Sequence, residues 1–129
     1  MLMPCLIDTN ILIYALTSNA AGPILARIDA AIANQAHYSI VTRMELLGWQ
    51  GHTSESRNKT ENLLAQLTEI PLTPSVVATV IDIRSSLSIK LPDAIIAASA
   101  LTANLPLLTR NTSDFLRIAE LQTINPFID

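Results

Sequence analysis

The sequence predicts an α/β fold in which helices cover both faces of a mostly parallel sheet. The main observation is that short apolar runs alternate along the chain with longer segments whose apolar residues recur at helical spacing. Composition agrees, because 50% of the residues are hydrophobic and only 4% are aromatic, and aliphatic runs are typical of parallel strands buried on both faces. The 129 residues are expected to form one domain, over residues 1–129, with a substantial core.

The first third of the chain starts with the strand expected at the centre of the sheet. Its apolar run stops abruptly at Asp8, which is typical of a buried strand that brings an acid to the rim of a sheet. Pro23 suits the first position of a helix, where its missing N–H does no harm. The expected elements are a strand over 4–8, a helix over about 9–17, breaks at Ser18-Asn19 and Gly22-Pro23, a helix from Pro23 to Asn34-Gln35, and a strand over 37–41.

The middle third alternates in the same way. Thr73-Pro74 predicts a helix start, because Thr is a good N-cap and Pro fits the first helical position. Leu63, Leu64 and Leu67 supply the buried side of a helix that is otherwise polar. The expected elements are a helix over about 42–50, a polar turn and helix beginning near His52, a strand over 69–72, and a helix that starts at Pro74 and runs through Leu87.

The last third contains a helix rich in small residues. Alanines on its inner face predict close packing against the sheet. Pro106 lies near the start of the next strand, where a lost hydrogen-bond donor matters least. The expected elements are a break at Lys90-Leu91-Pro92, a helix over 93–103, a strand over 105–109, a short helix over about 112–118 and a strand over 121–124.

The charge and the cysteine content exclude several classes of protein. A formal net charge of −3 excludes a strongly basic nucleic-acid-binding surface, but not an enzyme acting on nucleic acid, because bound metal offsets acidic charge. Cys5 fits a buried core residue better than a nucleophile, and one cysteine fits a reducing compartment. No segment approaches the roughly 18 apolar residues of a membrane span, and the N-terminus lacks secretory features. A cytoplasmic protein is expected.

Four acids stand at or near the starts of predicted helices. Asp8, Glu45 and Asp114 follow the first, second and fourth strands, and Asp93 heads the helix between. In open parallel sheets, ligands bind beyond the carboxyl ends of the strands. Two carboxylates about 4 Å apart repel by about 4 kcal/mol at an effective dielectric near 20, so a converging set needs protons or metal. Oxygen ligands of this kind suit Mg²⁺ or Mn²⁺ rather than Zn²⁺.

Each acid also has a purely structural explanation. Asp8 is a good helix N-cap. Glu45 ends the sequence Thr42-Arg43-Met44-Glu45, which fits a capping box. Asp93 follows Pro92 and can complement the helix dipole, and Asp114 can do the same after Asn111. The metal site is therefore predicted from the four acids together and not from any one of them.

The ordered motifs resemble those of a PIN-domain ribonuclease of the VapC toxin type, over about residues 4–127. The matching motifs are Asp8-Thr9-Asn10, Glu45 within Thr-Arg-Met-Glu-Leu, Leu91-Pro92-Asp93-Ala94-Ile95-Ile96-Ala97-Ala98, and Leu108-Thr109-Arg110-Asn111 with Asp114-Phe115.

The resemblance implies a three-layer α/β/α domain with a five-stranded sheet, and a Mg²⁺- or Mn²⁺-dependent endoribonuclease that forms a homodimer and is inhibited by a cognate antitoxin. It places the family's acids on Asp8, Glu45, Asp93 and Asp114. Asn111 stands where some relatives carry another acid, so one or two metal ions both remain open.

The residues next to the acids are candidates for supporting roles. Side chains that can orient carboxylates are Thr9, Asn10, Thr109 and Asn111. Cations that can hold RNA phosphates are Arg43, Lys90 and Arg110, with solvated side chains or ion pairs to the acids as the alternative.

Two other functions are weighed against the nuclease. A phosphoryl-transfer domain of similar topology lacks its key residues here: a receiver domain needs an acceptor Asp where Pro71-Leu72-Thr73 stands, and a haloacid-dehalogenase-type phosphatase needs an Asp in place of Asn10. A catalytically inactive PIN-like binding module would not need all four acids.

Overall fold

The computed structural model describes residues 4–18 and 22–128, and within them the chain alternates strands with helices as predicted. The expected break at Asn19 lies outside the described residues. The elements are β1 (Leu6–Ile7), α1 (Thr9–Thr17), α2 (Pro23–Ala33), β2 (His37–Ser39), α3 (Ile40–Leu47), α4 (Ser54–Ala65), β3 (Thr68–Ile70), α5 (Pro74–Ser86), α6 (Leu91–Ala103), β4 (Leu107–Leu108), α7 (Thr112–Phe115) and β5 (Thr123–Ile124).

The five strands form one parallel sheet in the order β3-β2-β1-β4-β5. β1 is central, with Leu6 in register with His37 on one side and Leu107 on the other. Because every pair is parallel, the carboxyl ends of all five strands lie at one edge. The chain builds outward from β1 in both directions, so the switch point where such sheets bind ligands lies between β1 and β4.

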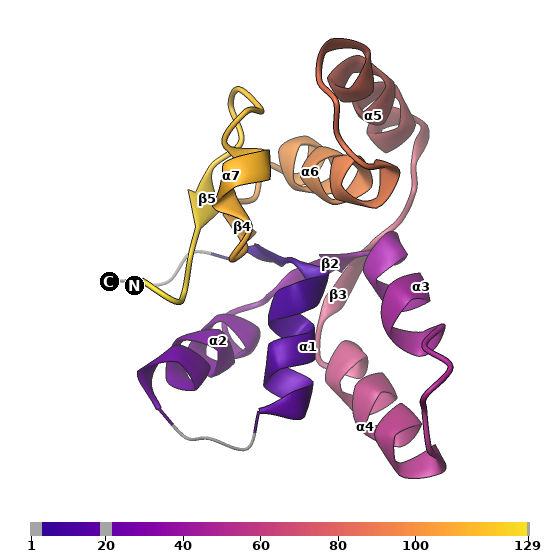
Figure 1. Ribbon diagram of the computed structural model, residues 1–129, viewed down its shortest axis with the longest axis vertical. Helices are drawn as coiled ribbons and strands as arrows, with labels where there is room; N and C mark the ends of the chain where they lie inside the picture. Colours follow the sequence, from indigo (N-terminus) through magenta and orange to yellow (C-terminus); the bar gives the residue numbers. More distant parts are fainter. Residues whose placement is uncertain (1–3, 19–21, 129) are drawn as a thin grey trace.

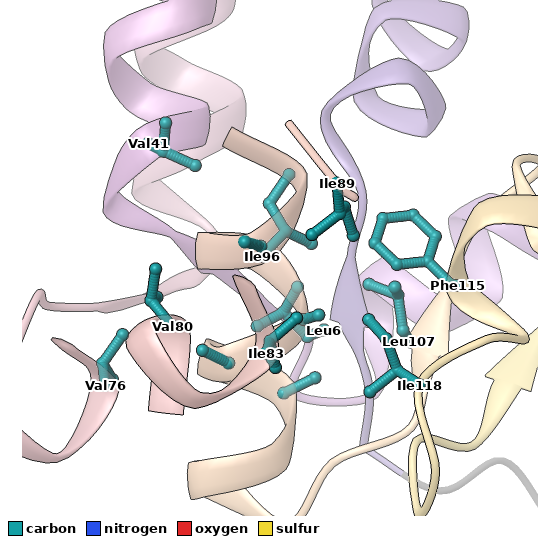
Figure 2. Packing of buried hydrophobic residues seen from close by; sticks show 14 residues of the cluster. Leu6, Val41, Val76, Val80, Ile83, Ile89, Ile96, Leu107, Phe115 and Ile118 are labelled. Carbon is teal, nitrogen blue, oxygen red and sulfur yellow. The ribbon is translucent and has the colours of Figure 1, made fainter. Parts of the chain in front are cut away.

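Helices cover both faces of the sheet, which gives the predicted three layers (Figure 1). Successive residues of a strand point to opposite faces, and the two core clusters divide the strands accordingly. Leu6 and Leu107 pack with α5, α6 and Phe115 of α7, as Figure 2 shows. Ile7 and Leu108 pack on the other face with α1, α2 and α4.

The α6 helix lies close against the sheet because its inner face is built of alanines. Ala94, Ala97, Ala98 and Ala100 are fully buried. Their small side chains let the helix axis approach both the sheet and α5. The small-residue helix predicted from the sequence is confirmed, and its close packing fixes its N-terminal turn beside the carboxyl ends of the strands.

Several element boundaries differ from the predicted ones by a few residues, and two of these differences affect the acids. β2 ends at Ser39 and not at residue 41, because the Ser39 hydroxyl accepts a hydrogen bond from the Val41 N–H and caps α3. The α6 helix begins at Leu91, two residues earlier than predicted, because Pro92 fits its first turn as well as it fits a break. Asp93 is therefore inside the first turn of α6.

Cys5 is a core residue, as predicted. Its side chain is buried. Burial raises the pKa of its thiol to about 11, so the thiol stays protonated at neutral pH and is unsuited to act as a nucleophile. In the described part of the chain, no helix has both the length and the apolar character needed to cross a membrane.

Candidate functional site

A polar cleft of about 700 Å³ opens at the carboxyl edge of the sheet. Its walls come from the starts of α1, α6 and α7, from α3, and from the segment between α5 and α6. Three of the four predicted acids line it, and the fourth, Asp8, is buried beside them. The lining residues are Asn10, Glu45, Arg84, Ser88, Ile89, Lys90, Pro92, Asp93, Asn111, Asp114 and Arg117.

Asp8 is placed by β1 and held by β4. It stands at the N-cap position of α1, but in the described structure its side chain makes no capping hydrogen bond. The Thr109 hydroxyl instead donates to Asp8 Oδ2 at 2.8 Å, and that hydroxyl accepts from the Asn111 N–H at 3.0 Å. The N-cap explanation for the Asp8 side chain is therefore wrong, and the carboxylate is fixed across the switch point.

The environment of Asp8 disfavours its charged form. Burial raises the pKa of the Asp8 carboxyl most, and the nearby charges of Asp93 and Glu45 raise it further. The hydrogen bond from Thr109 opposes these effects without cancelling them. Mutual repulsion of this kind requires that carboxylates from β1, α3 and α6 lie near one another, although they are far apart in sequence.

Asp93 and Asp114 form a second pair of interacting carboxylates. Partial burial raises the pKa of Asp93, the charge of Asp114 raises it further, and Lys90 opposes both. Asp114 is held by Asn111, whose Nδ2 donates to Asp114 Oδ2 at 2.9 Å. Asn111 therefore holds the Asp114 side chain in place.

Glu45 is held by two threonines and not by a helix cap. Because Ser39 caps α3, Thr42 is an interior helical residue and the predicted capping-box alternative is wrong. The Thr9 hydroxyl donates to Glu45 Oε1 at 2.8 Å and lies 2.8 Å from the Thr42 hydroxyl. A hydroxyl has one proton to donate, so Thr42 must donate to Thr9. The buried Thr42 side chain thus orients Glu45 through Thr9, a role that the sequence did not indicate.

The three predicted phosphate-binding cations have different surroundings. Lys90 lines the cleft and interacts with Asp93. Arg43 forms an ion pair with Glu69 of β3, and Arg110 lies over the Phe127 ring at 4.2 Å. Neither of these two arginines is among the residues that line the cleft.

Two other arginines line the cleft instead, Arg84 at the end of α5 and Arg117 after α7. The three-residue spacing between Asp114 and Arg117 was a usable signal, because residues three apart on a helical turn are neighbours. Arg84 carries no such signal, since only the packing of α5 against α6 brings it to the cleft.

The donor set suits a hydrated, hard dication. Within residues 4–18 and 22–128, no three His, Cys, Asp or Glu side chains are grouped closely enough to hold a metal ion, so the four predicted acids border one cleft without forming a closed cage. Mg²⁺ usually keeps several waters and binds through one or two carboxylates. A wide cleft lined by Glu45, Asp93 and Asp114, with Asp8 buried beside them, fits that requirement.

Comparison with known proteins identifies one family and several solved structures with a similar fold. The family model described as the PIN domain matches residues 5–121. A chain of the toxin–antitoxin complex from Klebsiella pneumoniae is 30% identical, with a TM-score of 0.78 over 95% of this chain and 97% of that one. A chain of VapBC-1 from nontypeable Haemophilus influenzae is 27% identical, with a TM-score of 0.83 over 98% and 100%.

A third structure shares the fold. A chain of VapBC2 from Rickettsia felis, solved with a promoter DNA fragment, is 23% identical, with a TM-score of 0.82 over 95% of this chain and 98% of that one. The comparison with curated proteins gives no match.

Proposed function

The chain belongs to the PIN-domain family, and from that premise we propose that it is a Mg²⁺- or Mn²⁺-dependent endoribonuclease, the toxin of a toxin–antitoxin pair. The observation that carries the proposal is the cleft, where carboxylates from α3, α6 and α7 gather beside Asp8, and where burial and the neighbouring carboxylates raise the pKa values of Asp8 and Asp93. Carboxylates arranged in this way are stabilised by a bound dication. Similarity to a chain of a toxin–antitoxin complex supports the biological role.

In this proposal, Asp8, Glu45, Asp93 and Asp114 are the catalytic acids that hold the ion. When bound, the ion would lower the pKa of a water and offset charge that develops on the phosphate oxygens. The chain's own contribution is to keep the acids in place. Thr109 orients Asp8 through a hydrogen bond of 2.8 Å, Thr9 orients Glu45 through one of 2.8 Å, and Asn111 orients Asp114 through one of 2.9 Å.

The alternatives are an inactive PIN-like module and a phosphatase-like hydrolase. An inactive module has no need for three hydroxyl or amide groups that orient acids around a cleft. A calorimetric titration with Mg²⁺ or Mn²⁺ separates the proposed nuclease from the inactive module, because the module should not bind the metal ion. The phosphatase alternative requires a carboxylate where Asn10 stands, and Asn10 lines the cleft as an amide.

The Asp93→Asn variant tests the proposal. It should cut a labelled single-stranded RNA roughly 1,000-fold more slowly in Mg²⁺, the scale expected when one charged group is removed from a preorganised site. The isosteric amide preserves the shape of the first turn of α6, so circular dichroism should be unchanged. Asp82→Asn is the matched control, since Asp82 is an exposed α5 residue outside the cleft lining. Wild-type cleavage rates in Asp93→Asn would remove the proposed mechanism.

An antitoxin is the proposed protein partner. An apolar pocket of about 280 Å³ between α1, α3 and α4 adjoins the cleft, and Glu45 lines both. Trp49, 62% exposed, lies in its wall. An inhibitory segment with an apolar side chain in this pocket and a basic one in the cleft would displace the metal. We also propose a homodimer, which sedimentation velocity would test directly.

A further inference from the structure

We propose that Arg84 and Arg117 bind the backbone phosphates of single-stranded RNA next to the phosphodiester that is cut. The inference rests on the proposed nuclease function and adds the surface that holds the substrate. Both arginines line the acidic cleft, together with Lys90. They come from segments 33 positions apart, one at the end of α5 and one just after α7.

Both guanidinium groups are fixed by the same short segment between α5 and α6. Arg84 Nε donates to the Ile89 carbonyl oxygen at 3.2 Å, and Arg117 Nη2 donates to the Ser88 carbonyl oxygen at 2.8 Å. A planar guanidinium held at one nitrogen presents its remaining N–H groups in a defined direction. This arrangement suits bidentate recognition of a phosphate.

The other nitrogens of these two arginines are available to a ligand. Within the described residues, the terminal nitrogens of Arg84 have no recorded hydrogen-bond partner, and the same holds for Nε and Nη1 of Arg117. Arg117 Nη2 lies 4.0 Å from Asp114 Oδ1, which is beyond hydrogen-bond distance. Neutral carbonyl oxygens therefore hold both arginines, and Arg117 is also at ion-pair distance from Asp114.

Two arginines outside the cleft lining are paired with carboxylates. Arg57 donates to Glu61 at 2.9 Å on the exposed side of α4, and Arg43 is paired with Glu69. Those two charges are largely offset by carboxylates.

The two arginines also supply positive charge to a cleft whose carboxylates repel RNA. The carboxylates of the cleft repel a polyanion, and a bound dication offsets that charge only near the cut phosphate. Arg84, Lys90 and Arg117 place positive charge on the α5 and α7 side of the same cleft. Flanking phosphates of an RNA strand are therefore expected to lie on that side and not over α1.

Salt-dependent RNA binding tests the inference. The variants Arg84→Gln, Arg117→Gln and the double variant are made in the Asp93→Asn background, which keeps the RNA intact, and the anisotropy of a fluorescein-labelled single-stranded RNA is measured over a salt series. Each lost phosphate contact should reduce the slope of log affinity against log salt by about 0.7. Arg57→Gln removes the same charge far from the cleft and should leave the slope unchanged.

Charge-preserving variants separate phosphate binding from a purely structural role. Arg84→Lys and Arg117→Lys lose the planar fork but keep the charge, so they should keep the salt slope with a weaker affinity. A slope that falls in the Lys variants, or a double Gln variant that matches Arg57→Gln, would overturn the inference. If wild-type protein neither binds nor cuts RNA, the proposed nuclease function fails instead.

Discussion

The central strands have two regions with opposite effects on stability. In the body of the sheet, β1 and β4 place fully or nearly fully buried aliphatic side chains on both faces. At the carboxyl rim, the next residue of each strand is polar: Asp8 follows β1 and Thr109 follows β4, and the two are hydrogen-bonded. The same strands therefore supply the core and hold a buried carboxylate whose charged form is disfavoured. The buried body of the sheet must therefore supply the stability that the acidic rim lacks.

The largest expected effect comes from the body of the sheet. Leu107→Ala should lower the free energy of unfolding by about 2–5 kcal/mol, because Leu107 is fully buried and truncation leaves a cavity. Urea denaturation measures the loss. Leu116→Ala removes the same atoms from a side chain that is 69% exposed and should cost less than about 0.5 kcal/mol. Equal losses in the two variants would contradict the assignment of Leu107 to the core.

At the rim, removal of a charge should raise the free energy of unfolding instead of lowering it. Asp8→Asn is expected to stabilise the metal-free protein at neutral pH by on the order of 1 kcal/mol, or about 3–5 °C in Tm. The amide oxygen can still accept from Thr109, while repulsion from Asp93 and Glu45 disappears. Thermal unfolding in the presence of a chelator measures the gain, and Asp82→Asn is the control.

The pH dependence of this gain gives a sharper test. The folded-state pKa of Asp8 is raised above its ordinary value of 3.8, so below that value both states are protonated and the wild type loses nothing. As pH rises through the raised pKa, the wild type loses stability and Asp8→Asn does not. The gain should therefore vanish in acid and grow toward neutral pH. A gain that is constant with pH would contradict a charge-based cause.

The last expected effect concerns the threonines that orient Glu45. Thr42→Val removes a buried hydroxyl with little change of shape and should cost less than about 1.5 kcal/mol. Loss of its hydrogen bond to Thr9 should weaken Mg²⁺ binding about tenfold by calorimetry, the lower end of the range for residues that orient metal ligands.

Two further variants separate orientation of Glu45 from stability. Thr42→Ser should restore Mg²⁺ affinity. Thr60→Val, at a buried threonine whose hydroxyl donates to the Ser56 carbonyl oxygen within α4, should leave the Mg²⁺ affinity unchanged. Equal affinity in Thr42→Val and wild type would show that Glu45 needs no such support.

The sequence predicted the order and type of the elements because their signals are local. Thr73 caps α5 by accepting from the Val76 N–H, as the Thr-Pro pair indicated. The predicted boundaries of β2 and α6 were wrong because two local signals compete at each of them. Ser39 could continue β2 or cap α3, and the sequence alone favoured the longer strand. Pro92 could break the chain or occupy the first turn of α6, and in the structure it does the latter.

By itself, the sequence determined the parallel α/β class, the central place of β1 and the four acids that are candidates for the site. These follow from hydrophobic periodicity and from polar residues at the ends of apolar runs, which are properties of neighbouring positions. Only the tertiary structure decided that Thr42 supports Glu45 through Thr9, that Arg43 and Arg110 lie away from the cleft, and that Arg84 and Arg117 line it. Hydrogen bonds and charge interactions depend on distance in space, and packing alone brings residues so far apart in sequence within reach of one another.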